Sequence, residues 1–435
     1  MSEVLVRGGT VVGPGGVRRA DVLCRDGLVV AVGEDLAPVS GAAVLDAGGC
    51  LVAPGLVDLH THLRQPGREE AETVLSGSRA AALGGYTAVV AMPNTEPAID
   101  SAAVVREVLD LARDALCRVA VAGAITVGRQ GERLAPLAEM AALGVRIFTD
   151  DGNGVQDGRL MRRALEYARP LGAVLAQHCQ DDALSAGGHM HEGEWSSRLG
   201  VPGAPAEAEE LMVMRDLALV RLTGTPVHFL HMSTAGSVAM VAAAKAQGLP
   251  VSAEAAPHHL CLTDALVAGY DPVFKVNPPL RTDSDTRAVR RGVASGALDA
   301  IATDHAPHSQ EAKELPFDQA PPGMIGLETA LAVALTELCG GDADDGRDMP
   351  VENVIGALSW RPAAIAGLTD QGGPVEPGRP ANLCVVDPAA TWVVEPSASA
   401  SRSRNTPFAG RKLTGRVRHT VSGGEPVVVD GEARR

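Results

Sequence analysis

Apolar and polar positions follow one pattern through the middle of the chain and another at its ends. Between about Pro54 and Leu368, short β-rich apolar runs alternate with longer Ala-rich stretches. Residues 101–116 and 206–222 are typical of these stretches, whose Ala and Leu content favours helix. Strands that alternate with helices indicate βαβ units and a parallel sheet.

The middle region contains eight candidate strands. This number predicts an α/β fold of the (β/α)8 TIM-barrel type. A doubly wound open sheet is the alternative, but the first strand-to-helix turn has no G-x-G-x-x-G sequence. The candidate strands are residues 51–60, 86–93, 117–125, 144–150, 173–178, 226–231, 251–257 and 298–304.

The two ends of the chain share a sequence pattern, in which short β-rich runs are interrupted by Gly and Asp. Such runs are typical of small β domains with tight turns. We expect the two ends to combine into one small β-sandwich domain beside the barrel. The predicted divisions are residues 1–53 and 369–435 for the two parts of this domain and residues 54–368 for the barrel.

Composition narrows the class of protein. With 46% hydrophobic and 21% charged residues, the chain is ordinary globular protein, and its net charge of −15 disfavours nucleic acid and anionic membranes as partners. No signal peptide or apolar run of about 20 residues is apparent. Seven scattered cysteines without a C-x-x-C motif indicate reduced thiols. We therefore expect a cytoplasmic protein that acts on a small molecule, without nucleic acid or membrane as partner.

Metal-ligating residue types stand at the ends of five candidate strands, where the chemistry of a barrel is located. Four imidazoles and two carboxylates could hold two divalent ions, with one carboxylate bridging them. Nitrogen and oxygen ligands suit Zn²⁺ best, with Mn²⁺ or Co²⁺ as alternatives. The residues are His60 and His62 after the first strand, Asp150 or Asp151 after the fourth, His178, His231 and Asp304.

Taken singly, each of these residues could have an ordinary structural role without binding a metal. An isolated histidine is more often a core or loop residue than a ligand, and Asp304 could cap a helix. His189-Met190-His191 repeats the His60–His62 spacing, but it lies in a Gly-rich loop, so we interpret it as surface. Five strand ends that all carry ligand types are hard to obtain by chance, and together they predict a metal centre.

Eight motifs occur in order along the barrel region and resemble a known family. They are DLHTHLRQPG, AMPNT, IFTDDG, AQHCQD, FLHMST, EAAPHH, KVNPPLR and ATDHAPH. The sequence is similar to the amidohydrolase superfamily, and specifically to bacterial dihydroorotases of the long, aspartate-bridged type. Dihydropyrimidinases, hydantoinases and allantoinases usually carry a bridging lysine after the fourth strand, where this chain has only aspartates.

The resemblance implies a role for each ligand. His60, His62 and Asp304 would bind one metal, His178 and His231 would bind the second, and Asp151 would bridge them because the family's bridging carboxylate precedes a glycine. Asp304 would also be the catalytic residue that accepts the proton of water and delivers it to the ring nitrogen.

The resemblance also implies the substrate-binding residues. The guanidinium fork of Arg64 matches a carboxylate, and the side chains of Asn94 and His308 would complete its site beside His62. Asn277 would contact the ring, and Pro322 and Gly323 would contact the substrate through their backbone. Residues 309–323 could form a lid over the site. His258 and His259 also lie near a strand end, where we expect a structural or supporting role.

The activity implied is reversible hydrolysis of dihydroorotate to N-carbamoyl-L-aspartate in pyrimidine biosynthesis. One alternative is a dihydropyrimidinase-like or allantoinase-like cyclic amidase. Another is a non-catalytic barrel that supports aspartate transcarbamoylase. The chain could also form a homodimer or join a complex with aspartate transcarbamoylase.

Overall fold

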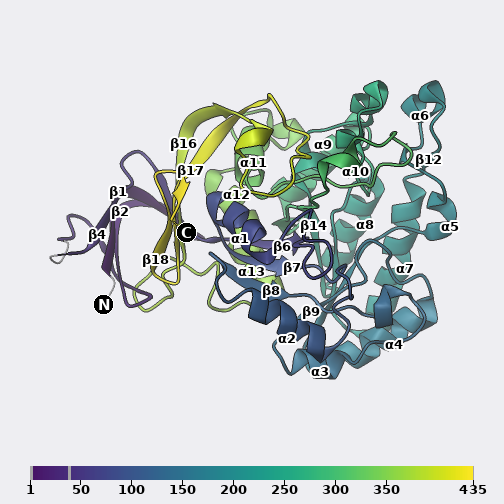
Figure 1. Ribbon diagram of the computed structural model, residues 1–435, viewed down its shortest axis with the longest axis horizontal. Coiled ribbons are helices and arrows are strands. Elements are labelled where there is room, and N and C mark those ends of the chain that lie inside the picture. Colours follow the sequence, from purple (N-terminus) through teal and green to yellow (C-terminus); the bar gives the residue numbers. More distant parts are fainter. Residues whose placement is uncertain (1–2, 38–40, 435) are drawn as a thin grey trace.

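The computed structural model describes residues 3–37 and 41–434 and has a mixed α/β fold with a separate terminal β-sheet (Figure 1). Each of the eight strand segments predicted for the middle region contains an observed strand. These strands are all parallel to their neighbours and form two sheets, in the orders β6-β7-β8 and β15-β14-β13-β10-β9. Their bounds are β6 (Leu56–Thr61), β7 (Tyr86–Ala91), β8 (Arg118–Val121), β9 (Ile147–Phe148), β10 (Val174–Gln177), β13 (Val227–Phe229), β14 (Val251–Ala255) and β15 (Ala300–Ile301).

Both edges of the three-stranded sheet are hydrogen-bonded to edges of the five-stranded sheet. The amide of His62, just after β6, donates to the carbonyl oxygen of His305, after β15, at 2.9 Å. On the other side, the amide of Thr149, after β9, donates to the oxygen of Gly123, after β8, at 2.8 Å. The carboxyl ends of the strands consequently face one rim.

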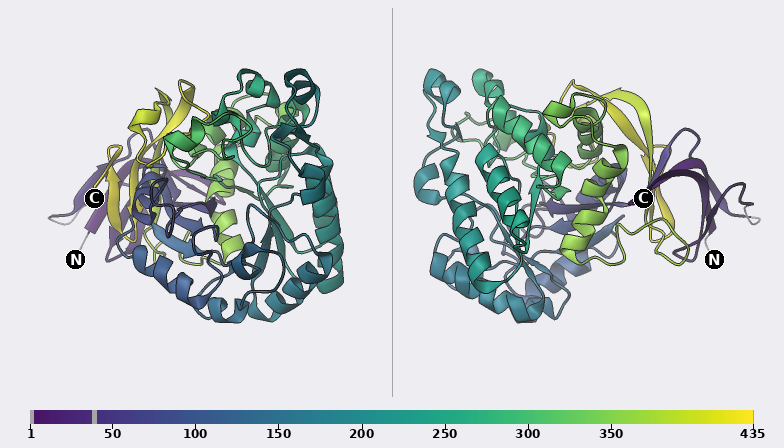
Figure 2. Two further views of the ribbon diagram at one scale, coloured as in Figure 1. Left: turned by 45° about the vertical axis from the view of Figure 1, so that its right-hand side comes forward. Right: turned by 180° about the vertical axis from the view of Figure 1, so that it is seen from behind.

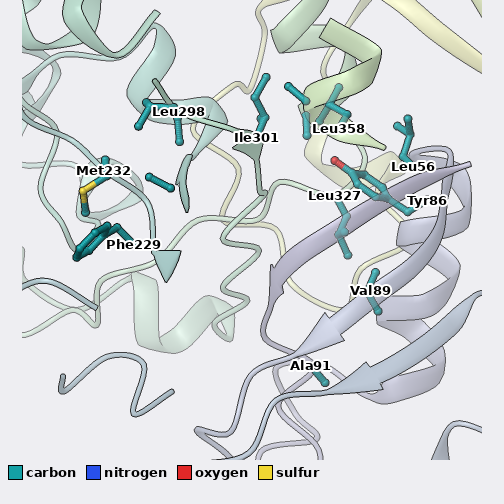
Figure 3. Packing of buried hydrophobic residues seen from close by; sticks show 14 of the residues in the cluster. Leu56, Tyr86, Val89, Ala91, Phe229, Met232, Leu298, Ile301, Leu327 and Leu358 are labelled. Carbon is teal, nitrogen blue, oxygen red and sulfur yellow. The ribbon is translucent and has the colours of Figure 1, made fainter. Parts of the chain in front are cut away.

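Helices surround these strands on the outside (Figure 2). Their inward faces and the outward faces of the strands form the main apolar cluster, which includes the fully buried Tyr86, Phe229 and Leu358 (Figure 3). Burial of each such side chain stabilises the fold by about 1.5–3 kcal/mol. The larger helices are α1 (Val74–Leu83), α2 (Ala102–Leu111), α4 (Gly158–Ala168), α7 (Glu207–Thr223), α8 (Ala235–Ala246), α9 (Asp283–Ser295), α11 (Ala330–Leu338), α12 (Val351–Leu358) and α13 (Trp360–Ala366).

Shorter elements lie mostly in the connections at the rim. They are α3 (Leu137–Ala141), α5 (Asp182–Ser185), β11 (Met190–His191), α6 (Glu194–Leu199), β12 (Gly203–Ala204) and α10 (Gln310–Lys313). Among the described residues, no helix has both the length and the apolar character required to cross a bilayer.

The terminal sheet is built from both ends of the chain, as the sequence predicts. Its nine strands are joined as one continuous sheet rather than as two separate ones, and β5 and β16 pair where the two ends meet. Val22, Val29, Leu383 and Val421, from both ends of the chain, share one apolar cluster, so the sheet curls around its own core. The strands are β1 (Glu3–Gly13), β2 (Gly16–Arg25), β3 (Leu28–Gly33), β4 (Ala43–Asp46), β5 (Leu51–Pro54), β16 (Leu383–Val393), β17 (Lys412–Ser422), β18 (Glu425–Val429) and β19 (Glu432–Ala433).

The first predicted strand, residues 51–60, is divided between the two parts of the molecule. β5 belongs to the terminal sheet and β6 to the barrel region, and Gly55 lies between them. A Cβ atom at Gly55 would collide with the side chain of Thr87 at the start of β7. The chain therefore changes sheets at a position where only glycine fits against the neighbouring strand.

Candidate metal centre and substrate site

The six predicted metal ligands come together at the rim formed by the strand ends. His60 is part of β6, and the other five follow β6, β9, β10, β13 and β15. All six residues are at most 5% exposed: His60, His62, Asp151, His178, His231 and Asp304. Buried charged groups are costly unless they are paired or bind a metal, so a cluster of this kind needs compensation.

Asp151 lies at the centre of the cluster. Its Oδ1 is 3.3 Å from His60 Nε2, 3.5 Å from His178 Nδ1 and 3.8 Å from His231 Nε2, and its Oδ2 is 3.5 Å from His62 Nε2. The same carboxylate thus belongs to two groups of potential ligands, one with His60 and His62 and one with His178 and His231. A carboxylate shared by two histidine pairs is the arrangement that a bridging ligand requires.

Asp304 lies on the side of the first histidine pair. Its Oδ1 is 3.3 Å from His62 Nε2 and 3.6 Å from His60 Nε2. Asp304 and His231 have φ angles of 47° and 34°, which residues with a side chain rarely adopt and which cost about 1–3 kcal/mol each. Both residues are therefore held in unfavourable backbone conformations directly at the cluster.

The cluster fits a divalent cation. Burial alone would raise the pKa of Asp151, yet the charge of His60 and the hydrogen bonds of His178 and His231 lower this pKa well below its usual range. Within the described part of the chain, the buried His60 Nε2 has no hydrogen-bond partner. Nδ1 of His178 and Nε2 of His231 approach each other to 2.9 Å beside Asp151. An unpartnered imidazole nitrogen that faces a buried anionic carboxylate, as His60 Nε2 does, is what a histidine ligand of a metal presents.

A hydrogen-bonded chain behind His60 is a feature that the motif analysis missed. His60 Nδ1 donates to Glu254 Oε1 at 3.0 Å, and His228 Nε2 donates to Glu254 Oε2 at 2.9 Å. Ser252 Oγ contacts the remaining nitrogen of His228 at 2.8 Å. These hydrogen bonds hold His60 in the tautomer that directs Nε2 at Asp151. A charged residue inside the apolar run of β14 was the available sequence signal.

The two adjacent aspartates after β9 have different surroundings. Asp150 accepts hydrogen bonds from the amides of Ile125 and Thr126 at 2.8 and 3.0 Å, and from the hydroxyl of Thr126. These bonds tie the carboxylate of Asp150 to the loop after β8, whereas Asp151 faces the histidines. The role of Asp151 as the shared ligand stays a prediction, and its carboxylate, not that of Asp150, is the one directed at the histidines.

Arg64 lies beside the cluster as a buried cation. Burial lowers the pKa of Arg64 to about 10, and its Nε donates to the carbonyl oxygen of Pro307 at 3.1 Å. Within residues 3–37 and 41–434, no carboxylate forms an ion pair with Arg64. The remaining guanidinium donors are consequently suited to an anionic group of a ligand.

Asn94 and Asn277 contact two of the predicted metal ligands. His62 Nδ1 donates to Asn94 Oδ1 at 2.8 Å, which directs His62 Nε2 toward the cluster. The side-chain nitrogen of Asn277 lies 3.4 Å from His178 Nε2. Both residues are half-buried, so each can contact an imidazole and still offer a polar group to a substrate.

His308, Pro322 and Gly323 form one packed unit beside Arg64. His308 Nε2 donates to the carbonyl oxygen of Pro322 at 2.8 Å, and burial together with the charge of Arg64 lowers the pKa of His308 to about 3. A Cβ atom at Gly323, where φ is 146°, would lie 2.7 Å from His308 Nε2. The Gly323 amide already donates to the oxygen of Lys275 at 2.9 Å, so the predicted backbone contacts of Pro322 and Gly323 with substrate stay a prediction.

The loop of residues 309–323 is held by hydrogen bonds within itself and by a distant segment of the chain. Lys313 Nζ donates to the carbonyl oxygens of Pro321 and Gly323, both at 3.1 Å. Asn405, in the C-terminal segment between β16 and β17, donates to the oxygens of Ala306 and Gly323 at 3.0 and 3.1 Å. The sequence did not predict that this C-terminal segment reaches back to the rim.

A cavity of about 160 Å³ adjoins the site on the side of Asn277 and Pro322, and Gln180, His189 and Lys275 also line it. A larger cavity of about 440 Å³ lies elsewhere, between α11 and the β16–β17 pair, behind His305.

The interpretation of the His189–His191 segment as surface was wrong for His191. This residue belongs to β11 and is buried, and its Nδ1 accepts a hydrogen bond from Arg281 Nη1 at 3.0 Å. His258 and His259 are buried close to the cluster, and His259 Nε2 donates to the oxygen of Pro278 at 3.1 Å. This bond gives His259 a structural contact.

Comparison with known proteins places the chain among relatives that share its full length. A sequence model of a family described as Dihydro-orotase-like matches residues 49–237. The chain is 49% identical to a dihydroorotase of Streptomyces coelicolor, over 99% of this chain and 100% of that protein. It is 48% identical to a dihydroorotase of Mycobacterium tuberculosis, again over 99% of this chain and 100% of that protein.

Solved structures of more distant proteins share the fold. An L-hydantoinase (dihydropyrimidinase) from Arthrobacter aurescens matches with a TM-score of 0.87 and 25% identity, over 100% of this chain and 98% of that one. A dihydropyrimidinase from Brevibacillus agri matches with a TM-score of 0.86 and 23% identity, over 99% and 96% of the two chains. At this level of identity, the similarity is evidence for a shared fold only.

Proposed function

Because this chain belongs to the dihydroorotase family, we propose that it is a dihydroorotase, a cyclic amide hydrolase that interconverts dihydroorotate and N-carbamoyl-L-aspartate. The observation that carries the proposal is the position of Asp151 between two histidine pairs, with the buried, unpaired cation of Arg64 beside them. A cyclic amide with an exocyclic carboxylate needs a hydrolytic centre and an adjacent fixed cation, and the rim supplies residues for both.

The proposed centre holds two divalent ions, with Zn²⁺ the best match to the ligand set. His60, His62 and Asp304 would hold one ion, His178 and His231 would hold the other, and Asp151 would be shared. Two such ions, when bound, lower the pKa of water and polarise the amide carbonyl. The buried Glu254 and the amide of Asn94 keep His60 and His62 in the required tautomers.

The other residues bind the substrate and move the proton. Arg64, Asn94 and His308 hold the exocyclic carboxylate. His308 is uncharged at neutral pH and has a single N–H, so it donates to the carboxylate when its bond to the Pro322 oxygen opens. Asn277 contacts the ring. Asp304 accepts the proton of the attacking water and passes it to the departing ring nitrogen.

The backbone of Pro322 and Gly323 closes the site. Because the Gly323 amide and the Pro322 oxygen bond within the protein, their proposed contact with substrate requires a small movement of the 309–323 loop.

For the architecture we propose a closed (β/α)8 barrel of residues 54–368, supported by the hydrogen bonds that join the two parallel sheets at both seams. Residues 1–53 and 369–435 would form the small domain. A cytoplasmic location and association with aspartate transcarbamoylase stay predictions.

A substrate panel tests the proposed activity. The metal-replete enzyme should hydrolyse dihydroorotate much faster than dihydrouracil, hydantoin or allantoin, and it should lose activity when a chelator removes the metal. All four compounds contain a cyclic amide or imide, but only dihydroorotate carries the carboxylate that Arg64 can bind. Faster turnover of hydantoin or dihydrouracil would contradict the proposal. Full activity in metal-free protein would contradict the metal centre.

A further inference from the structure

Lysine is rare in this chain, and two of its lysines lie together beside the proposed substrate site. The 38 basic residues include only four lysines, and the others are arginines. Lys313 is the last residue of α10, within the 309–323 loop (Figure 1), and Lys275 lies after β14, two residues before Asn277. Lys275 is 6% exposed and Lys313 is half-buried. Burying an ammonium is costly unless its hydrogen atoms find partners.

Three carbonyl oxygens surround the ammonium of Lys313. Its Nζ donates to the oxygens of Pro321 and Gly323, both at 3.1 Å, and to the oxygen of Lys275 at 3.4 Å. An ammonium has three N–H donors, so these bonds use all of them. In the part of the chain that the structure describes, no carboxylate forms an ion pair with Lys313. This group of one ammonium and three oxygens, the Lys313 tripod, therefore ties backbone segments together.

Lys275 strengthens the same junction from the opposite side. Its Nζ donates to the carbonyl oxygens of Phe317 and Asp318 at 2.8 and 3.1 Å, and both of these residues belong to the loop that contains Lys313. The carbonyl oxygen of Lys275 also accepts a hydrogen bond from the amide of Gly323 at 2.9 Å. Each lysine therefore binds backbone oxygens of the segment that carries the other.

The tripod joins two parts of the proposed substrate site. One part is the turn of residues 321–323, where the carbonyl oxygen of Pro322 accepts the hydrogen bond of His308 at 2.8 Å. The other part is the segment of residues 275–277, which ends at Asn277. In the proposed function, His308 and Asn277 contact different parts of the substrate, its carboxylate and its ring. A tie between the two segments therefore sets the spacing of the groups that bind substrate.

We propose that Lys313 is a positioning residue for the substrate: its ammonium holds the turn of residues 321–323 to Lys275, so that this side of the site is assembled before substrate binds. The inference rests on the proposed function. Ordering a loop during binding lowers affinity, and a loop that is already ordered avoids this loss. Lysine suits this position better than arginine, because its three donors point in three directions, whereas those of a guanidinium lie in one plane.

The tripod requires the charged form of Lys313. A neutral amine has only two N–H donors, and its lone pair would face the third oxygen. Burial, together with the charge of Lys275, lowers the pKa of Lys313 to about 7. A rise in pH through 7 should therefore loosen the tripod in the free enzyme.

Other charged or titratable groups also act on the two lysines. The pKa values of both histidines among them are lowered from 6.5, so neither histidine changes its charge as the pH rises above 7. These groups are Asp271, Asp318, His189 and His308.

Steady-state kinetics of Lys313 variants tests the proposal. At about pH 6, Lys313→Met should raise the KM for dihydroorotate about tenfold, because charge-assisted hydrogen bonds that hold the turn are lost, while kcat changes less than about twofold. Lys313→Arg keeps the charge but not the three directions, so its KM should rise similarly. Lys412→Met, at an exposed lysine on β17, is the matched control and should behave as the wild type.

The result with arginine separates the tripod from simple attraction of an anionic substrate. A cation that only attracts the substrate would act equally well as arginine, so a normal KM in Lys313→Arg overturns the proposal. A normal KM in Lys313→Met also overturns it.

The pH dependence tests the role of the ammonium. The KM of Lys313→Met divided by the wild-type KM should fall from about ten at about pH 6 toward one at about pH 8.5, because the wild-type lysine loses its charge. A ratio that stays constant overturns the requirement for the ammonium.

Hydrogen exchange of the substrate-free proteins measures the tripod without reference to activity. At about pH 6, the amide of Gly323 should exchange about tenfold faster in Lys313→Met than in the wild type, and unchanged melting temperatures would show that the variant folds. Equal exchange rates overturn the proposal. A wild type that protects this amide as expected but does not hydrolyse dihydroorotate would contradict the proposed function and not the tripod.

Discussion

The histidine–aspartate cluster lies beside the loop residues that are proposed to bind substrate, which are called the substrate rim below. The two regions are held in place in different ways. The cluster residues stand at strand ends, and buried side chains of neighbouring strands, such as Glu254 on β14, orient them. The rim residues Arg64, His308 and Gly323 lie on loops, and hydrogen bonds from distant segments, such as the side chain of Asn405, fix these loops. The cluster is thus determined mainly by the sheet, and the rim mainly by contacts between loops.

This difference leads us to expect that the two regions fail in different ways. Damage to the cluster should affect metal binding and the chemical step. Damage to the rim should affect substrate use while metal binding persists. The variants below separate the two kinds of effect, beginning with the largest.

Replacement of Asp304 by Asn should have the largest effect, because it removes the proposed proton acceptor. We expect turnover to fall by about 10³-fold, within the usual contribution of general acid–base catalysis. Steady-state kinetics with metal analysis of the same sample measures this effect, and at least some metal should remain bound. A variant that keeps more than a tenth of the wild-type rate would contradict the role of Asp304.

Replacement of Arg64 by Ala should lower kcat/KM for dihydroorotate by about 100-fold. The loss corresponds to charge-assisted hydrogen bonds of about 1.5–3 kcal/mol. Metal content should be unchanged, which distinguishes the rim from the cluster. Arg68→Ala is the control, because Arg68 lies on the same loop but is exposed. An Arg64→Ala enzyme with normal kcat/KM would show that the carboxylate binds elsewhere.

Replacement of Glu254 by Gln should weaken metal binding by about 10–100-fold, because His60 loses its orienting carboxylate. Competition with a chromophoric chelator gives the metal affinity directly, without reference to activity. At saturating metal, the KM for substrate should change little. Glu337→Gln is a control at a buried carboxylate that pairs with Arg347 and Arg411 instead. Equal metal affinities for wild type and Glu254→Gln would refute the support role.

The smallest expected effect concerns stability in acid. Burial, together with the charge of Arg281, lowers the pKa of His191 to about 4, below its usual value of 6.5. The unfolded chain therefore takes up a proton between pH 6.5 and 4 that the folded chain does not, so stability should fall as the pH drops through this window. His191→Asn keeps an acceptor for Arg281 but does not titrate. Melting temperatures from pH 7.5 to 4 should decline less steeply for this variant, and identical slopes would exclude the contribution.

The local sequence pattern was sufficient to predict the strands and to identify the residue types at their ends. Side chains in a strand alternate, and barrel strands end at one rim, so His60 and His62 could be assigned to the same place as His178, 118 residues further along the chain. The helix of residues 206–222 was equally visible, and it is observed as Glu207–Thr223.

Contacts between residues far apart in the chain were not predictable in this way. The division of residues 51–60 between two sheets depends on how closely Gly55 approaches Thr87. The burial of His191 depends on Arg281, which is 90 residues away.

The sequence by itself determined the alternation of strands and helices, the ligand types at the strand ends and the family, because these follow from local periodicity and from motifs. Only the tertiary structure decided that Asp151 faces the histidines while Asp150 binds the neighbouring loop, that Glu254 supports His60, and that the C-terminal segment anchors the rim. These outcomes depend on which buried polar groups find partners once the chain is packed, and packing joins residues that no local pattern connects.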